Sequence, residues 1–362
     1  MQTVAAQEKQ IFELLTAMGH EQVLFCNDEV SGLRAIIAIH NTVLGPALGG
    51  TRMWEYASDY DALVDALRLS QGMTYKAAVS GLNLGGGKAV ILGNPRQHKS
   101  EALFRRYGKF VESVNGKYIT AEDVGTTKQD MEYISAETKH VTGLPEHKGG
   151  SGDPSPVTAY GVYMGMKATA KKTFGTESLN GKKVVVQGVG NVGRNLVDHL
   201  INEGAHVTIA DIFEDQISAV TKKHSSVKVA SGDIFDLEMD IYAPCALGAT
   251  LNDDSIARLK AAMVAGAANN QLKNTEVHGK MLQEKGIWYG PDFVVNAGGL
   301  MNVYSELEGY NREAVMAQTE KIFDTTLRIL DIASNENTHP HEAAVRLADR
   351  RIAAIKHINS VL

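Results

Sequence analysis

The first half of the chain alternates short apolar runs with stretches of helical periodicity. Four runs have the length and composition of strands: QVLFCN (22–27), AIIAIH (35–40), KAVILG (88–93) and KYITAE (117–122). Residues near 59–79 and 100–114 instead repeat apolar positions at the spacing of one helix face. This mixture predicts an α/β unit.

A segment rich in Gly, Pro and Ser at 143–156 separates the two halves, and this composition is typical of an interdomain connection. Ser155 and Pro156 can cap and open the helix that follows. Beyond it, five short β-rich runs alternate with helical stretches: KKVVVQG, AHVTIAD, MDIYAPC, AMVAGAA and GIWYG. This alternation predicts a doubly wound parallel sheet, the architecture of nucleotide-binding folds.

The length of 362 residues fits two domains, because globular domains average about 150 residues. We place the first at 1–148 and the second at 149–335. Helical periodicity extends over 299–334 and over the C-terminal segment 336–362, and the pattern does not decide which domain that last segment joins.

Composition excludes several classes of function. The net charge of -6 is spread along the chain, so no basic patch for nucleic acid or an anionic membrane is expected. The N-terminus lacks a basic segment followed by an apolar stretch, and no membrane-length apolar run occurs, which favours a cytoplasmic protein. Cys26 and Cys245 have no CxxC or Cys/His spacing, and the histidines form no HExxH, so no metal site is expected.

A dinucleotide-binding fingerprint follows the predicted strand at 183–187. In Gly188-Val189-Gly190-Asn191-Val192-Gly193 the glycines permit a tight turn, approach of a pyrophosphate and close helix packing. The alternative is a plain glycine-rich turn. Asp211 ends the next strand 18 residues after Gly193, where an acid accepts the ribose hydroxyls and repels a 2′-phosphate. No arginine follows Asp211 directly, so the pattern favours NAD over NADP.

Three polar residues of the first half are candidates for proton chemistry. Lys76 lies toward the end of a helix, Lys88 follows three glycines that would let a substrate approach the backbone, and Asp123 ends a strand. A solvated loop position is the alternative for each lysine, and a capping or turn-forming role is the alternative for Asp123.

Eight segments together resemble the glutamate, leucine, phenylalanine and valine dehydrogenase family. They occur in family order over nearly the whole chain: LGPALGGTRMW, GMTYK, LNLGGGKAV, TAEDVGT, PSPVTAYGV, QGVGNVG, GAANNQL and PDFVVNAGG. The resemblance implies NAD-dependent oxidative deamination of an amino acid, in a cleft between a substrate and oligomerisation domain and a Rossmann domain. It also implies that segment 336–362 completes the first domain, and that the protein is a homo-oligomer, an octamer or a dimer.

The resemblance also implies the roles of individual residues. Lys76 would hold the substrate α-carboxylate, Lys88 would activate water, and Asp123 would carry protons to and from the amine. Further substrate contacts are expected from Leu48, Gly49, Gly50, Ala121, Asn270, Leu300 and Val303. Further cofactor contacts are expected from Thr158, Gly188, Val189, Gly190, Asn191, Val192, Gly193, Arg194, Asp211, Asn269 and Asn296.

The resemblance also addresses substrate choice. Leu48 stands where the glutamate-specific members carry a lysine, so the side-chain carboxylate of glutamate would have no partner. With Ala121, Leu300 and Val303, it gives an aliphatic wall suited to leucine, valine or isoleucine. The bulk of Leu300 resembles aromatic-selective members, so phenylalanine or valine specificity stays an alternative. A protein that binds NAD without catalysis is a second alternative, which the joint presence of Lys76, Lys88 and Asp123 disfavours.

Overall fold

The computed structural model describes residues 11–360, and they form two compact units. The first contains the chain up to Gly152, Glu306–Tyr310 and the segment from Asp349 onward, and the second contains Asp153–Ser305 and Asn311–Ala348. These limits differ by a few residues from the sequence-based boundary at 148/149 and by more from that at 335/336. Glu306 is tied to the first unit, since its carboxylate accepts hydrogen bonds from the backbone N–H groups of Gly143 (2.9 Å) and Ser151 (2.8 Å).

The first unit begins with a helix at residues 11–18 and continues as an α/β sequence. Its elements are β1 (Gln22–Asp28), β2 (Leu33–Asn41), β3 (Ala47–Trp54), α2 (Asp59–Val79), β4 (Gly85–Leu92), α3 (Glu101–Ser113), β5 (Tyr118–Glu122), α4 (Lys128–Ser135) and the 3₁₀ turn η1 (Glu146–Lys148). The expected helices and strands are present, with β4 extended backward over its three glycines. β3 was not predicted, because two glycines interrupt its apolar pattern.

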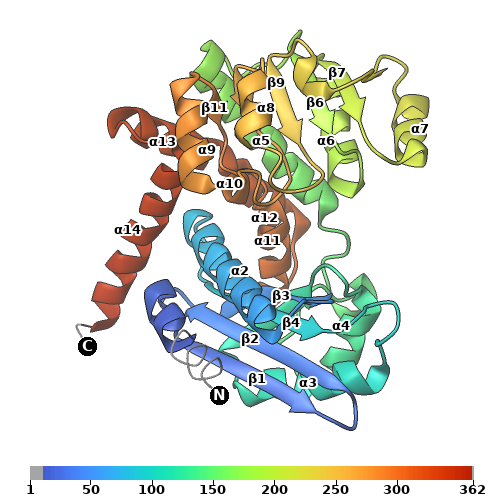
Figure 1. Cartoon of the computed structure of the whole chain (residues 1–362), viewed down its shortest axis with the longest axis vertical. Helices are drawn as coiled ribbons and strands as arrows, with labels where there is room; N and C mark the ends of the chain where they lie inside the picture. The colour runs from blue at the N-terminus through green and yellow to red at the C-terminus, as the bar shows by residue number, and fades with distance from the viewer. Residues whose placement is uncertain (1–10, 361–362) are drawn as a thin grey trace. The chain divides into compact units, whose positions relative to one another are not determined.

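The five strands form one mixed sheet in the order β1-β2-β4-β3-β5. β3 is parallel to both β4 and β5, whereas β1, β2 and β4 pair antiparallel. Helix α2 covers one face, where Ile36, Ala38 and Val90 pack against Leu63 and Leu67 (Figure 1). Helices α3 and α4 contribute to the apolar cluster on the other face. Successive residues of each strand therefore point alternately toward these two clusters.

The second unit is an alternating sequence of helices and short strands. Its elements are α5 (Ser155–Phe174), β6 (Lys183–Gln187), α6 (Asn191–Asn202), β7 (His206–Ala210), α7 (Glu214–Lys223), β8 (Lys228–Val229), η2 (Ile234–Asp236), β9 (Ile241–Pro244), α8 (Asp253–Arg258), β10 (Met263–Val264), α9 (Thr275–Glu284), β11 (Trp288–Tyr289), α10 (Asp292–Val295), α11 (Gly298–Tyr304), α12 (Arg312–Glu320) and α13 (Ile322–Asn335). The 3₁₀ turn η3 (Ser305–Glu308) and α14 (Pro340–Ser360) contribute residues to both units.

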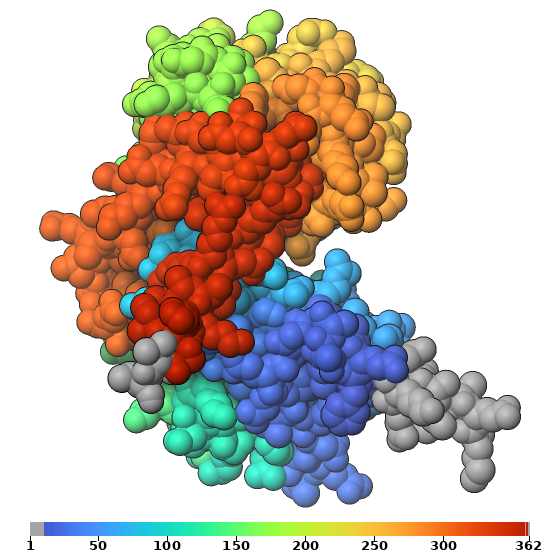
Figure 2. All heavy atoms as spheres, turned by 90° about the vertical axis from the view of Figure 1, so that its left-hand side faces the viewer, coloured from blue at the N-terminus to red at the C-terminus, as the bar shows by residue number. Residues whose placement is uncertain are grey.

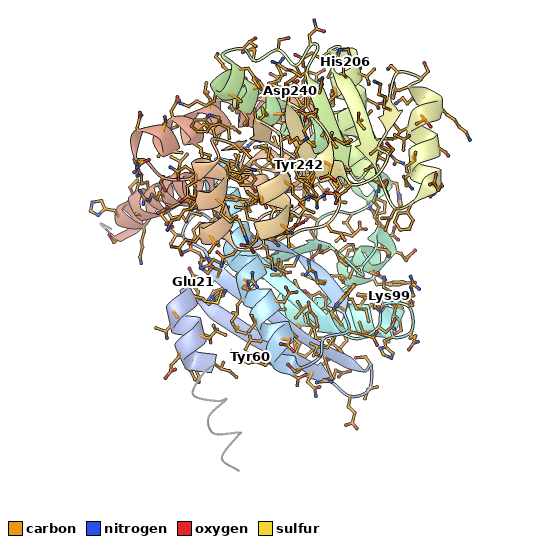
Figure 3. The ribbon with its side chains drawn as sticks, turned by 45° about the horizontal axis from the view of Figure 1, so that its top comes forward. Glu21, Tyr60, Lys99, His206, Asp240 and Tyr242 are labelled. Carbon is orange, nitrogen blue, oxygen red and sulfur yellow. The ribbon has the colours of Figure 1, made fainter. Side chains whose placement is uncertain are left out.

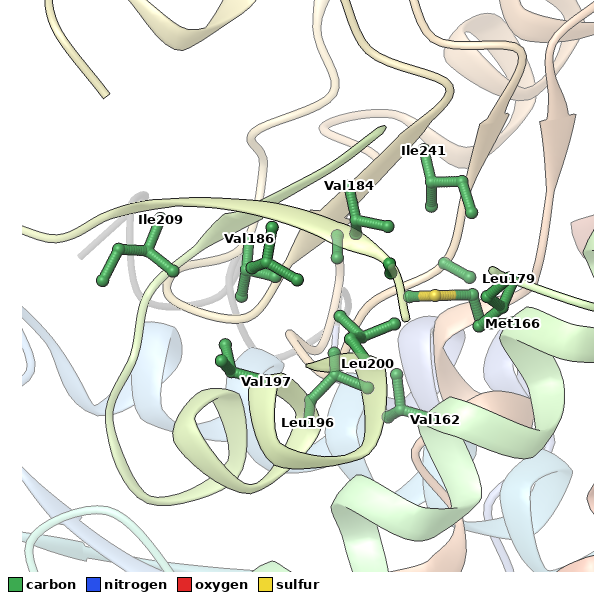
Figure 4. Close-up of a cluster of buried hydrophobic side chains, with 14 of the residues drawn as sticks. Val162, Met166, Leu179, Val184, Val186, Leu196, Val197, Leu200, Ile209 and Ile241 are labelled. Carbon is green, nitrogen blue, oxygen red and sulfur yellow. The ribbon is translucent and has the colours of Figure 1, made fainter. Parts of the chain in front are cut away.

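All pairs in the second sheet are parallel, as predicted, in the order β11-β10-β9-β6-β7-β8. The order reverses between β6 and β9, which is the point of a doubly wound sheet where ligands bind. Val184 and Val186 of β6 pack with Leu196 and Leu200 of α6 in a buried cluster (Figure 4). The first strand and helix of this fold are thereby fixed around the loop that joins them.

The end of α14 belongs to the first unit, where Figure 2 shows it in red against N-terminal residues in blue. Arg351 donates hydrogen bonds to the carbonyl oxygens of Ala78 (3.0 Å) and Leu82 (2.7 Å), and to Asn83 Oδ1 (3.0 Å). These bonds anchor the connection between α2 and β4. The predicted helical stretch 299–334 is divided instead into α11, η3, α12 and α13, and Gly309, with a positive φ of 87°, ends the helical backbone between η3 and α12.

The close packing of α2 on the sheet predicts a stability difference between two glycine variants. A Cβ at Gly86 would clash with the backbone nitrogen and Oγ1 of Thr74 in α2. We therefore expect Gly86→Ala to lower the free energy of unfolding by about 1–3 kcal/mol or more. Gly72→Ala is the matched control, because a Cβ at this exposed helical position meets no atom within 4 Å. It should stabilise by about 0.5–1 kcal/mol. Thermal unfolding followed by circular dichroism compares them, and equal midpoints would contradict this packing.

Candidate active site

The predicted catalytic pair, Lys88 and Asp123, comes together in the sheet of the first unit. Lys88 is the fourth residue of β4, and Asp123 follows the last residue of β5. By the alternation along β4, Lys88 shares the α2 face with Val90. β3 lies between β4 and β5, and across it the Lys88 ammonium forms an ion pair with the Asp123 carboxylate. The parallel pairing of three strands thus brings together charges 35 residues apart.

Both charges are largely removed from solvent. The side chain of Lys88 is 8% exposed and that of Asp123 is 22% exposed, so each needs the other as a counter-charge. Burial raises the pKa of the Asp123 carboxyl, but the charges of Lys88 and Arg52 outweigh burial and hold this pKa below its ordinary value. Asp123 is therefore an ionised carboxylate at neutral pH.

The backbone around Asp123 is also fixed. Its N–H donates to Thr126 Oγ1 at 2.9 Å, and that hydroxyl lies 2.9 Å from the carbonyl oxygen of Thr51, to which it can donate. Thr51 is a residue of β3. The turn after β5 is thereby tied to the neighbouring strand, which sets the direction of the Asp123 side chain.

The glycines before Lys88 serve packing within the protein. A Cβ at Gly85 would clash with the carbonyl oxygen of Asn41, one at Gly86 with α2, and one at Gly87 would lie 2.6 Å from the ring of Tyr118. Protein atoms fill this space, so the expectation that the glycines make room for a substrate is wrong. They instead let the strands and α2 approach closely enough to hold Lys88.

Two of the expected substrate residues of the first unit, Leu48 and Ala121, share the sheet face of this pair. Leu48 is 2% exposed and pairs with Gly86, and Ala121 is 8% exposed and pairs with Gly50. Both apolar side chains therefore point to the α2 face that carries Lys88. Lys76 lies in the last turn of α2. Gly49 faces the opposite side, where a Cβ would clash with the Gly87 carbonyl.

Arg52 lies in β3, four residues after Leu48, and the sequence did not predict it as a site residue. Its Nε lies 3.5 Å from Asp123 Oδ2, and its Nη1 donates to Asp65 Oδ2 at 3.0 Å. Tyr56 donates to the same Asp65 oxygen at 2.6 Å. Leu48 and Arg52 are four residues apart, so they lie on the same face if this segment is a strand. The sequence could not use this signal, because β3 was not predicted.

In the second unit, the three glycines of the fingerprint have separate geometric roles. Gly188 has a φ of 94°, and a Cβ there would lie 2.7 Å from the Cβ of Ala246. A Cβ at Gly193 would clash with the carbonyl oxygen of Gly188. Gly190, which precedes α6, has open space instead, with no atom within 4 Å of a Cβ. This open backbone at a helix N-terminus fits the pyrophosphate of a dinucleotide.

The neighbouring residues complete this loop. Asn191 and Val192 open α6, and Arg194 donates to Asn191 Oδ1 at 2.7 Å on the exposed side of the helix. Tyr242 of β9, labelled in Figure 3, donates to the side chain of Gln187 at the end of β6. This bond joins the two central strands directly before the glycines.

Asp211 holds the glycine-rich loop as well as standing at the expected ribose position. Its Oδ2 accepts the Val189 N–H at 2.7 Å, and its Oδ1 accepts the Phe213 N–H at 3.0 Å. The Gly188 N–H also donates to the Ala210 carbonyl at 2.7 Å. Each carboxylate oxygen has a second lone pair for a ribose hydroxyl. The spacing predicted the place of Asp211, but its bond to the loop was not predicted.

The second unit also contains the expected nicotinamide-side residues Thr158, Asn269 and Asn296 and the expected substrate residue Asn270. Asn296, the C-cap of α10, donates its amide to Asn269 Oδ1 at 2.7 Å and to the Ala267 carbonyl at 3.0 Å. Asn270 is exposed and has a positive φ of 52°, as turn asparagines often do. Thr158 donates to the Pro154 carbonyl at 2.9 Å within α5.

Helix α11 carries the expected substrate residues of the second unit. Leu300 is 7% exposed, and Val303 is partly exposed. The helix packs closely on α5, since a Cβ at Gly298 would clash with the Val157 carbonyl, and one at Gly299 would lie 2.7 Å from Thr158 Oγ1. Thr158 and Leu300 are therefore held on two helices with a fixed mutual position.

Residues 11–360 show neither a metal-binding cluster nor a membrane-spanning helix. No group of three or more His, Cys, Asp or Glu side chains in this range could hold a metal ion. No helix in the same range is both long and apolar enough to cross a membrane. Burial raises the pKa of the Cys26 and Cys245 thiols to about 12, so neither is a thiolate at neutral pH.

Two family models match nearly the whole chain. The model described as "Glu/Leu/Phe/Val dehydrogenase, dimerisation domain" matches residues 20–140, and that described as "Glutamate/Leucine/Phenylalanine/Valine dehydrogenase" matches residues 149–359. The chain belongs to this dehydrogenase family. The family resemblance drawn from the eight sequence segments is therefore confirmed.

Individual members of the dehydrogenase family align over almost their full length. The leucine dehydrogenase of Bacillus cereus is 54% identical over 351 residues, which cover 97% of this chain and 96% of the relative. The valine dehydrogenase of Streptomyces coelicolor is 50% identical over 92% of this chain and 93% of the relative. The crystal structure of L-tryptophan dehydrogenase from Nostoc punctiforme has a TM-score of 0.86 at 46% identity, covering 96% of this chain and 99% of that one.

The double role of Asp211 predicts how this dehydrogenase chooses its dinucleotide. In Asp211→Ala the expected ribose acceptor is lost, and the Val189 N–H loses its partner, which costs about 1–3 kcal/mol where the donor is buried. We expect the KM for NAD to rise about tenfold or more and the preference for NAD over NADP to relax. Asp215→Ala, an exposed acid in the first turn of α7, is the control. The measurement is kcat/KM for NAD and for NADP in each variant. If the ratio of these two values in Asp211→Ala equals that of the wild type, Asp211 does not set the preference for NAD.

Proposed function

We propose that the protein catalyses the reversible NAD-dependent oxidative deamination of L-leucine and other branched-chain L-amino acids to 2-oxo acids and ammonia. The observation that carries the proposal is the 54% identity to leucine dehydrogenases over 97% of the chain. The buried Lys88 and Asp123 pair beside the apolar Leu48 supports it, because it combines proton-transfer groups with an aliphatic wall. A homo-oligomer, an octamer or a dimer, in the cytoplasm is part of the same proposal, supported by the dimerisation-domain match.

The residues of the first unit supply the polar chemistry of this reaction. Lys76 binds the substrate α-carboxylate as a point charge and so fixes the α-carbon. Asp123, ionised beside Lys88, accepts a proton from the substrate amine. Lys88 orients the water that attacks the imine carbon, and its positive charge stabilises the oxygen as the carbon–oxygen bond forms. The carbon–nitrogen bond then breaks, Asp123 returns its proton to the leaving ammonia, and the proton lost by the water passes to solvent.

The second unit supplies the dinucleotide site. The open backbone at Gly190 would receive the pyrophosphate, and Asp211 would accept hydrogen bonds from the ribose hydroxyls. Thr158, Asn269 and Asn296 would orient the nicotinamide side. NAD, when bound, accepts the hydride that leaves the substrate α-carbon.

The side-chain pocket favours aliphatic substrates. Leu48 and Ala121 are both nearly inaccessible to water, so a glutamate carboxylate placed against them would lose its hydration without gaining a counter-charge. Valine or phenylalanine as the main substrate is the second candidate, supported by the bulk of Leu300 and by the 50% identical valine dehydrogenase. One methylene group changes discrimination by only about 1–3 kcal/mol, so the pocket alone ranks these substrates weakly.

The test of the function is NADH formation with leucine, valine, isoleucine, phenylalanine, alanine and glutamate, in the wild type and in Lys88→Ala. We expect leucine to be oxidised well, and Lys88→Ala to lose about 10²–10⁴ in kcat while it still binds NAD. Lys117→Ala, an exposed lysine directly before β5, is the matched control and should behave as wild type. If no amino acid supports NADH formation by the wild type, the protein binds NAD without this catalysis.

A second prediction concerns Leu48. Leu48→Lys places an ammonium against the aliphatic side chain of leucine, so kcat/KM for leucine should fall sharply, with at most a small gain on glutamate. Leu48→Met keeps the volume and apolar character and should retain most leucine activity. If Leu48→Lys oxidises leucine as fast as the wild type, or if the wild type oxidises glutamate efficiently, Leu48 does not line the substrate pocket.

A further inference from the structure

Arg52 of β3 lies between two carboxylates on the α2 face of the sheet. It pairs with Val90 of β4, whose side chain belongs to the cluster under α2. On one side its Nη1 donates to Asp65 in α2, and on the other its Nε approaches Asp123. Its side chain is 25% exposed, so the guanidinium is held among these partners rather than solvated.

The two ends of the guanidinium differ in how they are satisfied. Nη1 has a hydrogen bond to Asp65 Oδ2 at 3.0 Å. Nε is buried without a hydrogen bond, since Asp123 Oδ2 is at ion-pair distance, 3.5 Å, but outside hydrogen-bond geometry. A buried donor without an acceptor costs about 1–3 kcal/mol, so it needs an explanation. A small displacement of the Asp123 carboxylate toward Arg52 would complete this bond.

The position of the guanidinium is set independently of Asp123. Asp65 Oδ2, which accepts Nη1, also accepts the Tyr56 hydroxyl at 2.6 Å. Burial, followed by the hydrogen bond to Asp65 and its charge, raises the pKa of Tyr56, so this hydroxyl stays protonated as a donor. Arg52 therefore keeps its place when the partners of Asp123 change.

This inference rests on the proposed function. In the proposed reaction the partners of Asp123 change. Lys88 holds the carboxylate in the present structure, but it must turn its ammonium toward the substrate and water to act on them. Without a second cation from the protein, Asp123 would then be a largely buried carboxylate whose only counter-charge is the substrate ammonium, and a largely buried carboxylate that no protein cation holds is strongly unfavourable. Arg52 is the only other cation that the structure places within ion-pair distance of Asp123 among residues 11–360.

We propose that Arg52 is a positioning residue for Asp123. It holds this carboxylate ionised and within reach of the substrate amine while Lys88 is engaged with the substrate. Arg52 itself transfers no proton and touches no substrate. The Nε–H that lacks an acceptor in the present structure is the donor that receives the carboxylate.

The sign of the expected pH effect follows from the groups around Asp123. Lys88 faces it from β4 and Arg52 from β3, while Tyr118 of β5 lies close enough to interact electrostatically. On the side of α2, Asp65 acts through Arg52. Burial raises the pKa of Asp123, and both cations lower it. Loss of Arg52 therefore raises this pKa, and the activity that requires ionised Asp123 is lost at a higher pH.

The experiment compares Arg52→Gln and Arg52→Lys by the pH profile of kcat/KM for leucine. Arg52→Gln should lower kcat about 10- to 100-fold, move the acidic limb of the profile upward by about one pH unit, and leave the KM for NAD within about twofold. Arg52→Lys keeps the charge but loses the planar group, so its acidic limb should stay near that of the wild type while kcat falls less.

The matched control is Arg34→Gln, which removes an exposed arginine of β2 that also pairs with an aspartate of α2, Asp59, at 2.6 Å. It should leave the pH profile and kcat unchanged. A purely structural role of Arg52 would lower the melting temperature of Arg52→Gln without moving the acidic limb, and this outcome would overturn the proposal. If the acidic limb of the pH profile moves equally in Arg52→Lys and Arg52→Gln, the positive charge of Arg52 is not the cause, and the proposal is overturned. Absence of leucine oxidation by the wild type would instead overturn the proposed function, and the role of Arg52 with it.

Discussion

The ammonium of Lys88 is stable inside the first unit only because the carboxylate of Asp123 lies against it. A charge that is 8% exposed loses most of its hydration, and only a close counter-charge compensates for this loss. The two residues are 35 positions apart, so their meeting depends on the pairing of β3 with both β4 and β5. The mixed sheet is the part of the fold that brings together the two residues of the proposed proton chemistry.

The pairing of β3, β4 and β5 depends in turn on glycines. Gly86 lets α2 lie directly on β4, and Gly87 accommodates the ring of Tyr118 from β5. The strand that carries Lys88 is therefore enclosed by a helix on one face and an aromatic ring on the other. This enclosure keeps water from the ion pair and strengthens its electrostatic interaction. In the second unit glycines act differently, since Gly190 leaves space open for a ligand while Gly188 and Gly193 permit close packing.

The sequence predicted elements with strong periodicity and motifs with fixed spacing. The parallel sheet, α2 and the helix after the fingerprint are of this kind, because apolar repeats and glycine positions are local signals. It did not predict β3, whose glycines hide its strand pattern, and therefore could not find Arg52. It also assigned the glycines before Lys88 to substrate access, because only the folded chain shows which atoms fill the space beside them.

The alternate residues of β3 connect the proposed substrate wall with the proposed proton-transfer group. Leu48, Gly50 and Arg52 occupy successive positions on the α2 face. A Cβ at Gly50 would lie 2.8 Å from the Cβ of Asp123 and 2.7 Å from the carbonyl oxygen of Glu122, so the bare backbone there lets Asp123 approach the strand. Five residues of β3 thus contain the proposed aliphatic wall (Leu48), the space for the Asp123 carboxylate (Gly50) and the second cation beside that carboxylate (Arg52). A shift of this strand that adapted the wall to another substrate would also move the groups that position Asp123, which favours changing the side chain at Leu48 over moving the backbone.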